Sequence, residues 1–220
     1  MTVIEFNFND DWMGEISRRL GDLNDKTPDV ISQATNSTAR KARKLIVQSL
    51  REHYAEDAKT KEYNAAMKIA RASRKKYDAT IYIRGKVQNL RRFNVSPKDP
   101  PASGSSRPPT TRAQVLLQGG LKELNKGGIK AFITTFKNGD VVVAQRNGSF
   151  YTYHRPTGGI DRHHEAIDKL WSISIPKMAE SQLDPKTVRG NMRDTIQAVL
   201  VEEIEKQIAR QLAKHGGNAG

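Results

Sequence analysis

The fold class rests on residues 131–153, which read AFITTFKNGDVVVAQRNGSFYTY. Asn-Gly dipeptides stand at 138–139 and 147–148, and they suit the type I′ turn because both residues accept positive φ. The runs on either side of the dipeptides are rich in residues that favour strands: 131–136, 141–144 and 149–153. The stretch therefore predicts a three-stranded antiparallel meander with two Asn-Gly hairpins.

Helical periodicity marks both ends of the chain. Apolar and small residues recur every three or four positions over 30–54, which predicts a long amphipathic helix. A shorter pattern predicts a second helix over 61–76, and alternation at 79–83 predicts a strand that joins the meander sheet. Asp184-Pro185 suits the start of a C-terminal helix. The apolar stripe of this helix comprises Val188, Met192, Ile196, Val199, Leu200, Ile204, Ile208 and Leu212.

This order of elements predicts an α+β fold, with a small antiparallel sheet packed against long N-terminal and C-terminal helices. Residues 1–29 contain seven acidic and three basic residues and are predicted to form an acidic N-terminal arm. Residues 30–183 form the predicted α+β core, and residues 184–215 the C-terminal amphipathic helix. The core contains an extended Pro/Ser-rich loop at 94–112, and we expect this loop and the arm to become ordered on assembly.

The composition limits the possible functions. The 220 residues include 37 Lys plus Arg and 24 Asp plus Glu, and the net charge of +13 attracts polyanions and acidic protein surfaces alike. Cysteine is absent from the sequence, which excludes disulfides, a thiolate nucleophile and a cysteine-based zinc site. The sequence shows neither a signal peptide nor an apolar run long enough for a membrane span, so we expect no membrane association.

The sequence offers little for catalysis. It lacks a phosphate-binding glycine loop and a Gly-x-Ser-x-Gly nucleophile elbow. The one cluster of metal-ligand residue types comprises His154, His163, His164 and Glu165. Adjacent histidines point in different directions on a helix or a strand and are a poor chelating pair. We expect no enzymatic activity, no cofactor and no bound metal.

The basic residues are the candidate site. They could track a phosphate backbone, with Tyr77 and Tyr82 interleaved among them. They could instead meet acidic patches of a neighbouring subunit, such as the acidic arm at 1–29. We favour the neighbouring subunit and keep DNA as the alternative partner. The candidate residues are Arg40, Lys41, Arg43, Lys44, Arg71, Arg74, Lys75 and Arg84.

Several segments stand in an order and spacing that resemble a known family. The first is Ala34–Lys44, an alanine-rich stretch around Thr38-Ala39-Arg40-Lys41, and the last is Trp171–Met178, which contains a Ser-x-Pro-x-Met element. Between them lie Tyr63–Ser73, Ala79–Gly85, Phe93, Gly128–Ile133 and Val143–Arg146. Together they resemble the minor tail protein Z family of tailed bacteriophages over roughly residues 30–212. The insertion at 96–110 and the segment Thr157–Leu170 depart from the family pattern.

The resemblance implies a non-enzymatic virion protein that completes the tail at its head-proximal end and helps to join the tail to the head. It implies contacts with the tail terminator, the tail tube, the tape-measure protein and the head-tail connector. We expect several copies to form a ring around the tail axis, six-fold in preference to three-fold, with a passing contact to DNA as a further possibility. Assembly is expected in the host bacterial cytoplasm.

Overall fold

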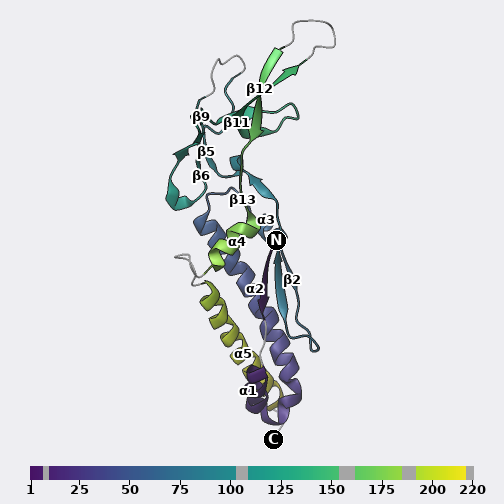
Figure 1. Cartoon of the computed structure of the whole chain (residues 1–220). Coiled ribbons are helices and arrows are strands. Elements are labelled where there is room, and N and C mark those ends of the chain that lie inside the picture. Colours follow the sequence, from purple (N-terminus) through teal and green to yellow (C-terminus); the bar gives the residue numbers. More distant parts are fainter. Residues whose placement is uncertain (7–9, 103–108, 154–161, 185–191, 217–220) are drawn as a thin grey trace. The chain divides into compact units, whose positions relative to one another are not determined.

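The computed structural model describes residues 1–6, 10–102, 109–153, 162–184 and 192–216 (Figure 1). It confirms an α+β fold in which helices accompany several small antiparallel sheets. The chain divides into two compact units, which differ from the three segments predicted by composition. Unit 1 comprises residues 1–50, 59–86 and 175–220, and unit 2 comprises residues 51–58 and 87–174.

The sheet of unit 1 is assembled from distant parts of the sequence. Its antiparallel strands are β1 (Thr2–Phe6), β2 (Met67–Ala70) and β3 (Ala79–Ile83), in the order β1-β3-β2. Ile81 lies opposite Ile4 on one side and Ile69 on the other. Side chains alternate along β3, so Ala79, Ile81 and Ile83 are fully buried on one face. The predicted strand at 79–83 is confirmed, but the prediction that it joins the meander sheet is wrong.

Helices make up the rest of unit 1. The predicted helix over 30–54 is confirmed, and the predicted helix over 61–76 is wrong after residue 66. The spacing of apolar residues at 65–70 is compatible with a helix as well as with a strand. Residues 67–70 form a strand because they pair with β3. The helices are α1 (Asp10–Leu20), η1 (Gly21–Lys26), α2 (Thr27–His53, whose last turn belongs to unit 2), α3 (Thr60–Ala66), α4 (Ile175–Leu183) and α5 (Met192–Gly216).

The core of unit 1 lies between α1, α2 and α5. Ile16 and Leu20 of α1 pack with side chains of the other two helices, and Trp12 and Met13 lie against the cluster. Ala34 and Ala42 of α2 are fully buried, as expected of small residues that let another backbone approach. The other core members are Val30, Ile31, Leu200, Ile204 and Ile208.

This packing corrects the prediction of a flexible arm at 1–29. Within that segment the described residues form β1, α1 and η1, and all three elements belong to unit 1. Their apolar side chains at Phe6, Ile16 and Leu20 are buried. The acidic composition of residues 1–29 drew attention away from these few apolar residues, which are enough to join the segment to the core. For the C-terminal helix, Asp184 directly follows the last residue of α4, and Pro185 and the stripe position Val188 lie outside the described residues.

Unit 2 is built from short antiparallel strands. The predicted loop at 94–112 is bounded by paired strands, because Val95 lies opposite Ala113; residues 103–108 within it are not described. The sheets join β13 (Trp171–Ser174) to β4 (Val87–Asn89), β5 (Asn94–Ser96) to β6 (Arg112–Gln114) and β7 (Lys122–Glu123), and β8 (Asn125–Lys126) to β9 (Ile129–Lys130). The short helical turns are η2 (Leu90–Arg92) and η3 (Leu117–Gly119).

A fourth sheet of unit 2 holds the predicted meander, and its first hairpin is confirmed. Strand β10 (Phe132–Thr135) pairs with the start of β11 (Val141–Tyr153). The turn differs from the expected type I′ because only Gly139 has a positive φ, of +85°. The Gly139 N–H donates to the carbonyl of Phe136 at 2.8 Å, and the Phe136 N–H donates to Asp140 at 2.8 Å. This pattern is the three-residue hairpin loop that ends in a left-handed glycine.

The second predicted hairpin is wrong. Strand β11 continues past Asn147-Gly148 without a turn. Its partner is β12 (Arg162–Lys169), a segment to which the sequence analysis assigned no structure. The register shifts between Arg146 and Phe150, so the dipeptide forms a β-bulge. The Asn147 side chain accepts a hydrogen bond from the Ser149 N–H at 2.9 Å, and Gly148 has φ +80°. A glycine with positive φ can stand in a β-bulge as well as in a turn, so the dipeptide alone does not distinguish the two.

Candidate functional site

All eight predicted basic residues lie in unit 1, and the fold separates them into two groups. One group sits on α2, and the other lies on the loop between β2 and β3 and just past the end of β3. Several of them are already bound within the chain. The α2 group comprises Arg40, Lys41, Arg43 and Lys44, and the second group comprises Arg71, Arg74, Lys75 and Arg84.

Lys41 is held by two acids of α5. Its Nζ lies 2.8 Å from Oε1 of Glu203 and 3.3 Å from Oε1 of Glu202. The Glu203 side chain is only 3% exposed. Burial alone would raise the pKa of Glu203, but the hydrogen bond and charge of Lys41, with help from Lys206 and Ser37, lower it below the ordinary value. Lys41 therefore links α5 to α2, and its charge is matched by these two acids although its side chain is 41% exposed.

The lowered pKa of Glu203 predicts a pH dependence. A carboxylate with a lowered pKa stabilises the folded state above its unfolded pKa of about 4.3, and the contribution is lost as the pH falls further. We expect Glu203→Gln to have a lower melting temperature than the parent at pH 7. The difference between the two melting temperatures should be smaller at pH 3. The control Glu202→Gln removes a mostly exposed partner of the same lysine and should change the profile little. An equal gap at both pH values would contradict the assignment.

Two more of the predicted residues have internal contacts, and a third is partly buried. Arg74 Nε lies 3.0 Å from Oδ1 of Asp29. The Arg84 guanidinium lies 6.0 Å from the centre of the Tyr82 ring, on the neighbouring position of the same sheet face. Arg43 is half-buried, and its Nε has no hydrogen-bond partner among the described residues. These contacts leave Arg40, Lys44, Arg71 and Lys75 as the outward-facing members of the predicted set.

Two lysines that were not singled out as site residues complete this surface. Lys68 of β2 and Lys76 of the β2–β3 loop are exposed like the four residues above. Their local sequence gave no reason to separate them from ordinary surface lysines. We call this surface the basic strip: Arg40, Lys44, Lys68, Arg71, Lys75 and Lys76.

A second surface, in unit 2, was not found from the sequence. Strands β11 and β12 continue as a two-stranded ribbon after β10 has ended, since β10 pairs only as far as Ala144 (Figure 1). We call this ribbon the β-arm, formed by Arg146–Tyr153 and Arg162–Asp168. It carries Phe150 at 70% exposure and Tyr151 at 55%. The sequence predicted residues 149–153 only as a strand of the meander and gave no sign that Phe150 and Tyr151 stay exposed.

Both faces of the β-arm present large side chains. Phe150 lies opposite Glu165 on the neighbouring strand. Ile167 is two residues from Glu165 on the same strand and therefore lies on the same face as Phe150. On the other face Tyr151 stacks on His164, with ring centres 5.7 Å apart. An ion pair of 3.3 Å joins Arg146 to Glu165 across the ribbon. The ribbon is therefore internally ordered and still exposes apolar area.

The residues of metal-ligand type at 163–165 do not gather around a common point. His163 and His164 follow each other on β12 and point to opposite faces, where His163 contacts Thr152 and His164 contacts Tyr151. Among the described residues no group of three His, Cys, Asp or Glu side chains is placed to hold a metal ion. His154 lies outside the described residues.

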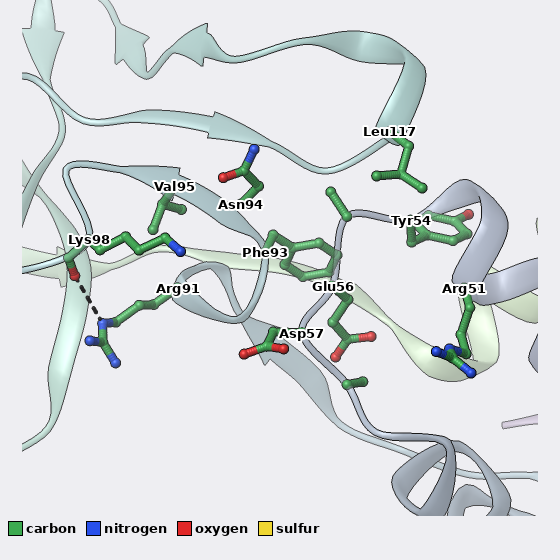
Figure 2. Close-up of a pocket in the computed structure, with 12 residues that line it drawn as sticks. Arg51, Tyr54, Glu56, Asp57, Arg91, Phe93, Asn94, Val95, Lys98 and Leu117 are labelled. Carbon is green, nitrogen blue, oxygen red and sulfur yellow. Dashed lines mark hydrogen bonds between the residues drawn. The ribbon is translucent and has the colours of Figure 1, made fainter.

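The hollow between residues 51–58 and strand β5 is a polar cavity of about 690 Å³ (Figure 2). Figure 2 shows Arg51 at one end, Arg91 and Lys98 at the other, and Glu56 between them. The Glu56 side chain is 0% exposed, and its Oε1 lies 3.1 Å from Nε of Arg92. The acid is thus neutralised by a structural partner.

The comparisons with known proteins identify the chain. The family model described as prophage minor tail protein Z (GPZ) matches residues 15–215. No curated protein matches the chain, and no solved structure does either. Within the described part of the chain, no helix is long and apolar enough to cross a membrane. The match covers the described helices α2 and α5 and nearly all of the strands between them, so the chain belongs to the minor tail protein Z family of structural phage tail proteins.

Proposed function

We propose that this tail protein completes the tail at its head-proximal end and takes part in joining the tail to the head. In this proposal several copies form a closed ring, six-fold in preference to three-fold. The ring contacts the tail terminator, the tail tube, the tape-measure protein and the head-tail connector. The observation that carries the proposal is the exposed β-arm, because a protein whose role is assembly needs docking surface.

The edges of the β-arm suit a repeated contact between copies. Strand β12 is the last strand of its sheet, and β11 has no strand on its other side beyond Ala144 among the described residues. The ribbon thus offers two different edges with unpaired backbone groups. Such edges are templates for another strand. When the edge of β12 adds to the edge of β11 in the next copy, the contact is heterologous, and a heterologous contact forms a ring when the rotation between copies closes.

The side chains of the β-arm support the same reading. A two-stranded hairpin alone is at best marginally stable in water. Exposed aromatic side chains are the usual anchors of protein interfaces, where they enter desolvated pockets. Phe150 and Tyr151 occupy neighbouring positions on opposite faces, so a neighbouring copy that covers the ribbon buries at least one of them. We infer that the β-arm gains its stability from the adjacent copy.

The proposed place of the protein is tested by deleting its gene. We expect heads filled with DNA and tails of normal length to accumulate as separate particles in electron micrographs, and infectious titre to fall by orders of magnitude. Complementation from a plasmid should restore joined particles. Joined, infectious particles without the protein would contradict the proposal. Purified protein should form one ring size in mass photometry, and a monomer at micromolar concentration would argue against the ring.

A further inference from the structure

The loop that carries half of the basic strip is fixed to α2. The Asn36 side chain donates to the carbonyl of Ala72 at 3.0 Å and accepts from the Ala72 N–H at 2.9 Å. Within the loop, the Ser73 N–H donates to Lys76 at 2.6 Å. Arg74 adds its ion pair with Asp29. The bases at 71, 75 and 76 are therefore held in place next to the helix.

Strand β2 and α2 run side by side in opposite directions (Figure 1). Lys68 lies four residues before Ala72, about 13 Å along a strand, which equals about nine residues of helix and puts it at the level of residue 45. Because Lys68 pairs with Tyr82, its side chain lies on the sheet face opposite the buried Ile81 and Ile83. From the level of Asp29 to that of Lys44 the strip extends over roughly 23 Å, or about seven base pairs of duplex at 3.4 Å each.

Three acids near the strip are paired with other bases, whereas Asp78, two residues after Lys76, forms no ion pair with the described residues. Asp29 pairs with Arg74, Glu203 with Lys41, and Glu205 with Arg19 at 2.5 Å. Lys41 and its two acids mark the border of the strip towards α5. Among the described residues, Lys44, Lys68, Arg71, Lys75 and Lys76 form no ion pair. Arg40 makes one hydrogen bond, of 3.1 Å, to the Ser37 hydroxyl. The charge of the strip is therefore not cancelled within the described chain.

The strip differs from the β-arm in having no apolar anchor. None of the large apolar side chains that are exposed in the described chain belongs to α2, β2 or the loop at 71–78. Protein interfaces are usually anchored by buried aromatic or apolar side chains and are depleted in lysine. A phosphate backbone, by contrast, needs only fixed positive charge. The composition of the strip thus fits a polyanion better than a protein surface.

We propose that the basic strip binds the phosphate backbone of double-stranded DNA without reading its sequence. Lysine and arginine contacts to phosphates position a protein on the duplex and carry no base information. The duplex is also the polyanion that a phage particle holds. This activity goes beyond assembly and does not depend on the ring, because each copy carries its own strip.

The test is a salt titration of DNA binding by the full chain. Fluorescence anisotropy with a 20-base-pair duplex would be measured between 50 and 200 mM salt for the parent and for Arg71→Gln/Lys75→Gln/Lys76→Gln. Each lost phosphate contact removes about 0.9 from the slope of log K against log salt, so the triple variant should lose about 2.7. We expect its affinity at 50 mM salt to fall at least about tenfold. Two duplexes of unrelated sequence should give the same values.

A matched control separates the strip from overall charge. Lys122→Gln/Lys126→Gln/Lys137→Gln removes three exposed lysines of unit 2 and leaves the same net charge as the loop variant. Its slope should change by less than 1. Equal losses in both variants would overturn the proposal, as would unchanged DNA binding with loss of ring formation, which would mark a protein-binding surface. If the loop variant melts early in circular dichroism, Arg40→Gln/Lys44→Gln takes its place, with an expected loss of about 1.8.

Discussion

Replacing Phe150 and Tyr151 by serine is expected to abolish ring formation while leaving the protein folded. Both side chains are more than half exposed in the single chain, so unit 2 loses little when they are removed. In the ring at least one of them would be a buried aromatic anchor, and such anchors contribute about 2 kcal/mol or more apiece. Loss of about 2 to 4 kcal/mol raises the concentration needed for assembly by roughly 30-fold to a thousandfold. Plasmid complementation with this variant should leave heads and tails unjoined.

Mass photometry of the parent and the variant over nanomolar to micromolar concentrations measures this effect. The control is Leu117→Ser/Leu121→Ser, which removes two exposed apolar side chains of the same unit outside the β-arm. Measured at a concentration below that of ring assembly, circular dichroism should show the same melting temperature for all three proteins within about 2 °C. Rings that survive in the Phe150/Tyr151 variant, or that are lost equally in the leucine control, would remove the β-arm from the proposed contact.

The second large effect concerns the core of unit 1. Ile204→Ala removes a side chain that is 1% exposed and packed between α1, α2 and α5. Buried isoleucine-to-alanine changes destabilise by about 3 kcal/mol, because transfer energy is lost and a cavity remains. We expect unit 1 to unfold at a clearly lower urea concentration in this variant. The free energy of unfolding should fall by about 3 kcal/mol.

The reporter for this measurement is Trp12, which lies against the same core cluster. The sequence has two tryptophans, so the experiment uses a Trp171→Phe background to remove the signal from unit 2. The control is Val201→Ala on the same helix, where the side chain is 38% exposed and little free energy should change. Similar losses for Val201 and Ile204 would show that α5 does not dock through the face described above.

The sequence could predict those features that a local pattern specifies. The helix α2 was found because small and apolar residues repeat at helical spacing over six or more turns. Strand β3 and the first hairpin were found because strand formers alternate or flank a dipeptide that favours turns. The α+β class and the family followed from the order of these elements. The eight candidate bases were visible as well, since charge is a property of composition.

Long-range contacts decided the rest. Asn147-Gly148 forms a bulge because β12, from a segment the sequence left unassigned, is there to pair on both sides of it. Residues 67–70 are compatible with helical and with strand periodicity, and pairing with β3 makes them a strand. Likewise Lys41 and Lys44 look alike in the sequence, but only Lys41 faces the acids of α5. Local periodicity thus determined which elements form. Tertiary packing alone determined which bases are neutralised and which aromatic side chains stay exposed, because partners distant in the sequence supply the opposing charge and the covering surface.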